Sequence, residues 1–156
     1  MEAFFAALEA TAPAQYLRAS RWGYAGVSSA HILGIALLVG TILPLNLRLL
    51  GLWPSIPRAN LLRVLVPIAA TGLALAVVTG TLLFSVRAQE YASVGYLQAK
   101  LVLVLLGLLS ALAIHRAYGL TLEGTSKRQL SFHALFSLGC WLGALACGRL
   151  IAFAID

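Results

Sequence analysis

Four long apolar segments take up most of this 156-residue chain, over residues 22–47, 59–86, 94–117 and 130–154. A helix needs about 20 apolar residues to cross the hydrocarbon core of a bilayer, so each segment is long enough to span a membrane. Only 10% of the residues are charged and the mean hydropathy is +0.93, whereas about a quarter of the residues of a soluble domain are charged. The sequence therefore predicts an all-α integral membrane protein in the lipid bilayer. The short connections predict a single domain, an antiparallel bundle of four transmembrane helices.

The amino-terminal segment, residues 2–12, is too short to span a bilayer. Phe4, Phe5 and Leu8 recur within it at helical spacing, which is typical of a helix that lies in the membrane interface. We expect Pro13 to end this short interfacial helix, because proline interrupts helical hydrogen bonding.

The charge of the chain indicates its topology rather than a nucleic-acid partner. The formal net charge is +6, but the basic residues occur singly near the ends of the apolar segments instead of in one stripe. Six lie near the loops after the first and third segments, and three lie on the opposite side when two bases inside apolar segments are left out. The positive-inside rule therefore predicts that both termini face away from the cytoplasm. The six are Arg48, Arg58, Arg63, Arg116, Lys127 and Arg128, and the three are Arg18, Arg21 and Arg87.

His31 is the polar residue that most strongly indicates a functional site. It lies about ten residues into the first apolar segment. An ionisable side chain is energetically unfavourable at that depth in a membrane and usually has a function. The residues from Trp22 to Gly34, which include Tyr24, surround it with small side chains. Such a segment lets a flat cofactor or a neighbouring helix approach the backbone closely.

Two cations are expected at a similar depth to His31. Counted from the same ends of the bundle, Lys100 and Arg149 lie about six residues in, so the three groups fall within about 6 Å of one another in depth. No acid lies inside the four segments to pair with them. We therefore expect a site for an anion or a polar head group, such as the propionates of haem, a quinone head, or a carboxylate lipid or substrate.

A structural interpretation of these residues stays open. Lys100 and Arg149 can extend their long side chains to the interface. The imidazole of His31 can be satisfied by a hydroxyl on a neighbouring helix, such as that of Thr79 or Ser85.

His115 and His133 form a second candidate pair, near the opposite ends of the third and fourth segments. Two imidazoles on facing helices are what a six-coordinate haem iron needs, but each residue also lies close enough to an interface to reach the head groups. His31 and His133 differ in depth by about 18 Å at the helical rise, so one iron is not expected to join them.

The two cysteines and several glycines have ordinary roles in a membrane bundle. Cys140 and Cys147 lie seven residues apart in one segment, about 10 Å along a helix. That separation is too great for a disulfide, so we expect buried free thiols. Gly139 and Gly143 have the spacing of close helix contacts. This pattern favours tight packing or a homo-oligomer.

Two motifs resemble those of a family of small four-helix bacterial inner-membrane proteins of unknown function. The first runs from His31-Ile-Leu-Gly to Leu-Arg-Leu-Leu-Gly51, and the second is Gly148-Arg-Leu-Ile-Ala-Phe153. The resemblance implies a multi-pass protein of the bacterial inner membrane, which with the charge pattern puts both termini in the periplasm.

The same resemblance draws attention to His31, Arg48 and Arg149. The chain departs from the family pattern at Asn46, where that pattern has an aspartate, so an ion pair at this position is not expected. The family brings no reaction with it. More loosely, a four-helix bundle with intramembrane histidines is similar to the small membrane cytochromes b.

Two functions remain open from the sequence. The first is a haem b protein, with His31 as axial ligand of the iron and Lys100 or Arg149 on the propionates, that passes electrons between the quinone pool and an extracytoplasmic partner. A quinone is the other candidate cofactor. The alternative is a non-catalytic subunit or assembly partner of a larger membrane complex. No catalytic residue is predicted, because the chain has no His-Glu-x-x-His motif and no acidic relay of the kind that transporters use.

Overall fold

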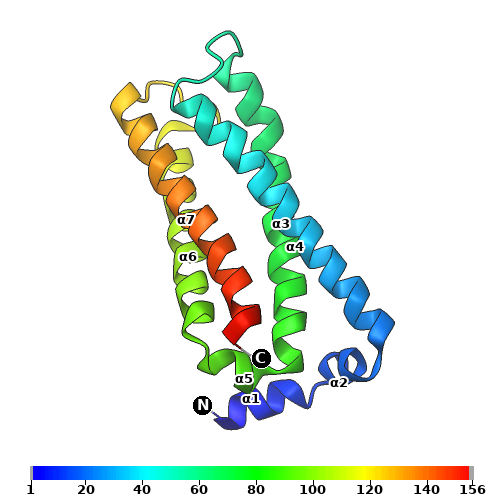
Figure 1. Ribbon diagram of the computed structural model, residues 1–156. Coiled ribbons are helices and arrows are strands. Elements are labelled where there is room, and N and C mark those ends of the chain that lie inside the picture. Colours follow the sequence, from blue (N-terminus) through cyan, green and yellow to red (C-terminus); the bar gives the residue numbers. More distant parts are fainter. Residues whose placement is uncertain (1, 155–156) are drawn as a thin grey trace.

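The computed structural model describes residues 2–154, and this part of the chain forms seven helices and no strand. Figure 1 shows four long helices side by side, with three short helices gathered at one end of the molecule, where both ends of the chain also lie. The four long helices are long and apolar enough to cross a membrane, so the predicted all-α fold with four candidate membrane-spanning helices is confirmed. The helices are α1 (Glu2–Glu9), α2 (Ala12–Ala19), α3 (Arg21–Leu49), α4 (Arg58–Val86), α5 (Ala88–Ser93), α6 (Gly95–Tyr118) and α7 (Lys127–Ala154).

The amino-terminal helix is shorter than predicted. It ends at Glu9, and a second helix, α2, begins at Ala12 with Pro13 in its first turn. The expectation that Pro13 ends the first helix was therefore wrong. Proline is favourable at this position because the first turn of a helix has no use for the missing N–H group. The short helix α5 was not predicted.

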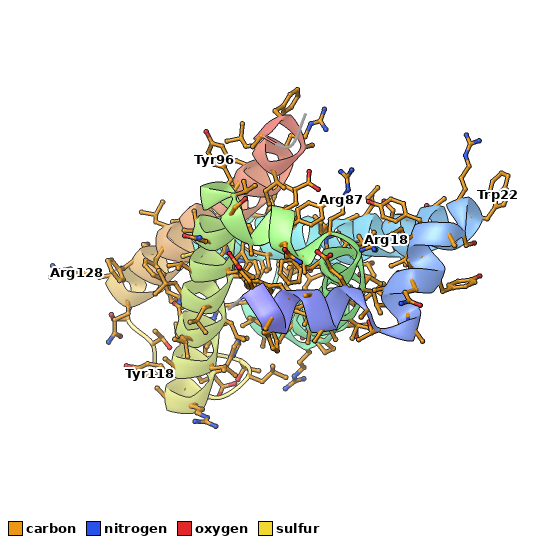
Figure 2. All side chains as sticks on the ribbon, turned by 90° about the horizontal axis from the view of Figure 1, so that it is seen from below. Arg18, Trp22, Arg87, Tyr96, Tyr118 and Arg128 are labelled. Atoms are coloured by element: carbon orange, nitrogen blue, oxygen red, sulfur yellow. The ribbon has the colours of Figure 1, made fainter. Side chains whose placement is uncertain are left out.

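The short helices form a cap across one end of the bundle. Figures 1 and 2 both show α1 lying crosswise to the long helices. Glu9 of α1 accepts a hydrogen bond from the backbone N–H of Gln89 at 2.9 Å and lies 3.7 Å from the guanidinium of Arg18. Arg18 in turn donates to the carbonyl of Val86. These contacts fasten α1 and α2 to the junction of α4 and α5.

The four long helices pack as two hairpins. In the first, α3 and α4 approach closely at Gly34 and Gly72: a Cβ on Gly34 would lie 2.7 Å from the backbone nitrogen of Ala76. In the second, α6 and α7 pack where Trp141 lies against Gly107. The backbones of the hairpins come closest at α3 and α7, whereas α4 and α6 have few close backbone contacts.

The core fills the half of the bundle near the two loops between the long helices. All four long helices contribute to its larger cluster, and Leu122 from the second loop closes it. A smaller cluster around Trp141 joins α3 to α7. The opposite half, which holds His31 and Lys100, is less tightly filled, and both of these side chains are only partly buried. The larger cluster consists of Leu45, Leu49, Leu62, Ile114, Leu122, Leu130 and Ala134.

Arginines hold the two loops in place. Arg48 donates to the carbonyl of Ile56 at 2.8 Å and to that of Pro54, so it fixes the first loop. Arg58 donates to the carbonyl of Leu122 at 2.9 Å and so joins the first loop to the second. Arg48, which the resemblance singled out, therefore has a structural role at this end.

Candidate functional site

His31 lies in the contact between α3 and α4. Its Nδ1 is 3.1 Å from the Oγ1 of Thr79, one of the two hydroxyls proposed from the sequence as its partner. The other, that of Ser85, donates to the carbonyl of Leu82 instead. The ring rests on Gly80, where a Cβ would lie 3.0 Å from the ring carbon Cε1. The glycine therefore lets the imidazole lie against the backbone of α4.

The hydrogen bonds of Thr79 assign the tautomer of His31. The Thr79 hydroxyl donates to the carbonyl of Leu75 at 2.6 Å, and a hydroxyl has only one proton to give. It therefore accepts from His31, which places the ring proton on Nδ1. The neutral ring is left with a lone pair on Nε2, and none of the described residues forms a hydrogen bond to that atom.

Lys100 points toward the same part of the molecule from the other hairpin. Its side chain leaves α6 and lies over Gly148 of α7, with Nζ 3.3 Å from the position that a Cβ on Gly148 would occupy. The ammonium group is within electrostatic range of His31 and of Cys147. No hydrogen bond or ion pair to Lys100 is found within residues 2–154. The side chain thus crosses α7 instead of following α6 to the interface, and its charge stays unpaired.

Arg149 does not join this pair. Its guanidinium lies over the ring of Phe153, 4.8 Å from the ring centroid, and the residue is exposed. Lys100 and Arg149 therefore lie at one level of the bundle but on different faces, because Arg149 follows Gly148 directly and is rotated about 100° from it around the helix.

Two other residues that were proposed for cofactor binding have different surroundings. Gly34 is buried at the close contact with Gly72, where it serves helix packing. Tyr24 lies seven residues before His31, about 10 Å along α3, and its hydroxyl contacts that of Tyr91. Burial, with a smaller contribution from Tyr24, raises the pKa of the Tyr91 phenol.

The second histidine pair lies near the loop end, as its position in the sequence suggested. The Nδ1 of His133 is 3.0 Å from the Oγ of Ser110 on the facing helix. The Nδ1 of His115 lies 3.3 Å from the carbonyl of Gly119. Both imidazoles thus have local partners, and each is within electrostatic range of the other. Within the described part of the chain, no group of three or more His, Cys, Asp or Glu residues is placed to hold a metal ion.

Some residues of this region were missed by the sequence-based argument. Gly80 and Gly148 give His31 and Lys100 their positions, and counting residues from the helix ends would have found both at the level of the two polar groups. The buried Asn46 donates to the Oγ of Ser137 at 3.0 Å and joins α3 to α7. Cys140 and Cys147 are free thiols, as predicted.

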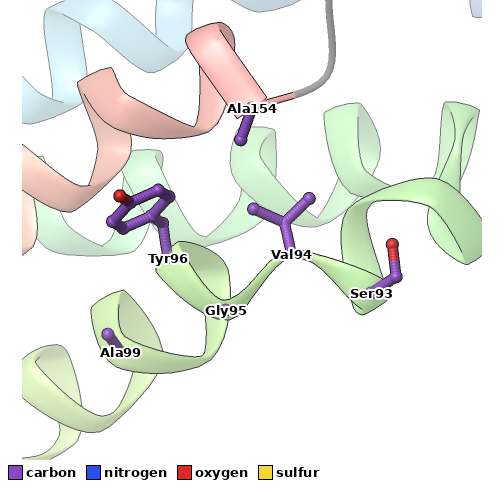
Figure 3. A pocket seen from close by; sticks show the side chains of 6 residues that line it. All are labelled: Ser93, Val94, Gly95, Tyr96, Ala99 and Ala154. Carbon is purple, nitrogen blue, oxygen red and sulfur yellow. The ribbon is translucent and has the colours of Figure 1, made fainter.

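Two shallow depressions on the described surface are lined by residues other than His31. The larger, of about 520 Å³, lies where α6 begins and α7 ends. Figure 3 shows Tyr96, Val94 and Ala154 around it. The smaller, of about 340 Å³, lies over the ion pair of the cap.

Comparison with known proteins assigns no family. The chain matches no family model, and no curated protein and no solved structure matches it.

Proposed function

We propose that this chain is a quinone-binding subunit of an electron-transfer complex in the bacterial inner membrane, with both termini in the periplasm. The proposal depends on one observation: His31, in the contact between α3 and α4, and Lys100, which lies over Gly148 of α7, are within electrostatic range of each other, and no hydrogen bond to the Nζ of Lys100 or to the Nε2 of His31 is found among the described side chains. Polar groups are rarely left without partners inside a membrane. A ligand that supplies both partners accounts for them.

The head group of a quinone suits this pair. It is a flat, largely apolar ring with an oxygen at each end, and its isoprenoid tail keeps it in the bilayer. Lys100 would donate to one oxygen, and the Nε2 of His31 would accept from the hydroxyl at the other end when the ring is in its reduced, quinol form. The ring would enter sideways from the lipid, on the side where α4 and α6 have few close backbone contacts.

The same geometry supports a subunit rather than a complete enzyme. Electrons that leave a quinol need a second redox group, and the described residues bring together no cluster that could hold a metal centre. A partner protein would therefore supply that group. The proposal thus keeps the alternative of a subunit of a larger membrane complex, and it takes quinone rather than haem b as the cofactor.

Haem b fits the residues of this chain only in part. Its iron would take the free Nε2 of His31, and Lys100 would pair with a propionate. However, His133 lies near the other end of the bundle, Arg149 faces elsewhere, and neither depression reaches His31. One chain therefore offers an incomplete haem site, and a haem would need its second ligand and part of its pocket from another chain.

Binding of a short-chain benzoquinone to the purified protein in lipid nanodiscs tests the proposal. We expect Lys100→Met to weaken binding about tenfold, the effect of losing one hydrogen bond from a charged donor. Arg149→Met removes a cation from the same level but from the other face of α7, and it should leave the affinity within about twofold. Equal losses in both variants, or no binding by the wild-type protein, would contradict the proposal.

A further inference from the structure

We infer that the site at His31 and Lys100 is selective for the reduced ligand, and binds a quinol more tightly than the corresponding quinone. This inference rests on the proposed function and adds which redox state is recognised. It depends on the direction of the hydrogen bonds around His31.

That direction is set by a short chain of hydrogen bonds along α4. The carbonyl of Leu75 takes the proton of the Thr79 hydroxyl at 2.6 Å, so the hydroxyl oxygen accepts the Nδ1 proton of His31 at 3.1 Å. A carbonyl cannot donate, so the chain cannot run the other way. In the neutral ring, Nε2 is therefore always an acceptor.

The two ends of the site require different hydrogen-bonding groups on a ligand. Nε2 needs a hydrogen-bond donor, whereas the ammonium group of Lys100 can only donate and needs an acceptor. A phenolic hydroxyl is both donor and acceptor, so a quinol satisfies both ends. A quinone has carbonyl oxygens only, and it would turn one of them toward the lone pair of Nε2.

The ring cannot easily turn over to offer a donor instead. Its face rests on Gly80, with the Cβ position of that residue 3.0 Å from Cε1 and 3.4 Å from Nδ1. A flip would place the carbon Cδ2 where Nδ1 now meets the Thr79 hydroxyl, and the hydrogen bond between them would be lost. The preference for a hydroxyl is thus built into the packing of α3 on α4.

An anionic lipid is the other ligand class that Lys100 would attract. Its phosphate oxygens are acceptors without a proton to donate, so they cannot form a hydrogen bond with the lone pair of Nε2. The described geometry therefore favours the quinol, and phosphate binding becomes one outcome of the test.

The experiment compares the affinities of a short-chain benzoquinol, kept anaerobic, and the matching benzoquinone for the full-length protein in nanodiscs. Because a buried polar group without a partner weakens binding by about tenfold or more, we expect the quinol to bind about tenfold more tightly. The variant His31→Gln offers a donor and an acceptor from one amide, so the ratio should fall toward one. His133→Gln, at the opposite end of the bundle, should keep the wild-type ratio.

A spectroscopic measurement tests the premise independently of binding. In protein labelled with ¹⁵N-histidine, the signals lost in His31→Gln should show a protonated Nδ1 and an unprotonated Nε2 at neutral pH. The reverse assignment would overturn the inference even if ligands bind.

The remaining outcomes separate the inference from the proposed function. Equal affinities for quinol and quinone in the wild-type protein would overturn the inference and leave the proposed function intact. Binding of anionic-lipid vesicles or phosphate in place of either ring would overturn both. If His31→Gln does not fold, the ratio of quinol to quinone affinities in the wild-type protein still tests the inference.

Discussion

Single polar residues inside this bundle act by joining helices, and Asn46 shows the effect most directly. Its side chain is 2% exposed and donates to Ser137 across the contact between α3 and α7. Hydrogen bonds between membrane helices contribute about 0.6 kcal/mol on average and up to about 1.7 kcal/mol. This one lies beside the smaller core cluster, where the two hairpins meet.

We predict that Asn46→Ala lowers the free energy of unfolding by about 1–2 kcal/mol, because it removes the hydrogen bond and leaves the Ser137 hydroxyl without a partner. Unfolding in mixed detergent micelles measures this loss. The double variant with Ser137→Ala should lose less than the sum of the two single changes. Strict additivity would show that the two side chains do not interact.

The aspartate of the resembled family should be tolerated less well at this position. We predict that Asn46→Asp destabilises the protein more than Asn46→Ala does, because a buried carboxylate would have only the Ser137 hydroxyl to solvate it. The same unfolding measurement compares the two variants. A more stable Asn46→Asp protein would mean that an arginine or another donor reaches this residue.

At the scale of helices, the contact between α3 and α4 depends on glycine residues, which have no side chain. Gly34 and Gly72 let the two backbones touch: a Cβ on Gly72 would lie 2.7 Å from the backbone nitrogen of Leu38. This contact lies about one turn from His31 on α3. It therefore fixes both the packing of the hairpin and the distance between His31 and Thr79.

We predict that Gly34→Ala destabilises the protein by about 1–3 kcal/mol, because the added methyl group forces the backbones apart. Gly40, on the same helix, has no atom within 4 Å of its Cβ position. Gly40→Ala should therefore be neutral or slightly stabilising, as alanine favours helix over glycine. Similar losses of unfolding free energy in both variants would contradict this account.

The elements could be predicted from the sequence to different degrees. Hydropathy identified α3, α4, α6 and α7 to within about three residues at each end, because it reports directly on transfer to lipid. The break between α1 and α2, and the whole of α5, were missed because six to eight residues are too few for a periodic pattern.

The candidate site was predictable in depth but not in direction. Counting residues predicted His31, Lys100 and Arg149 at a similar depth, and the structural interpretation offered Thr79 or Ser85 as the partner of His31, of which Thr79 is the one observed. It did not separate Lys100 from Arg149, since rotation around a helix depends on packing. In the structure, Gly148 has no side chain, so Lys100 can pack over α7 at this position. Arg149 lies over the ring of Phe153, on another face of α7.

At the scale of the whole molecule, one end of the bundle is tightly closed and the other is looser. The loop end has the large core cluster and the arginines that bind the loops. The opposite end has the cap of short helices, and His31 and Lys100 lie in the half of the bundle next to this cap. Most of the basic residues lie at the loop end, so that end is expected to face the cytoplasm.

We therefore predict that epitope tags at both termini are removed by protease added to spheroplasts, whereas a tag inserted between Gly119 and Ser126 is protected. Disrupted membranes, in which all tags should be cleaved, provide the control. Protection of the terminal tags in intact spheroplasts would reverse the orientation, and would place the site at His31 near the cytoplasmic face.

The central claim is that His31 and Lys100 hold a quinone head group. The most direct measurement is the quinone content, together with the oxidised and reduced absorption spectra, of protein purified from haem-supplemented cells, for the wild type and for His31→Ala. The account predicts about one quinone per chain in the wild type, its loss in His31→Ala, and no Soret band in either protein. A Soret band that disappears in His31→Ala, without bound quinone, would contradict the claim and identify the ligand of His31 as haem.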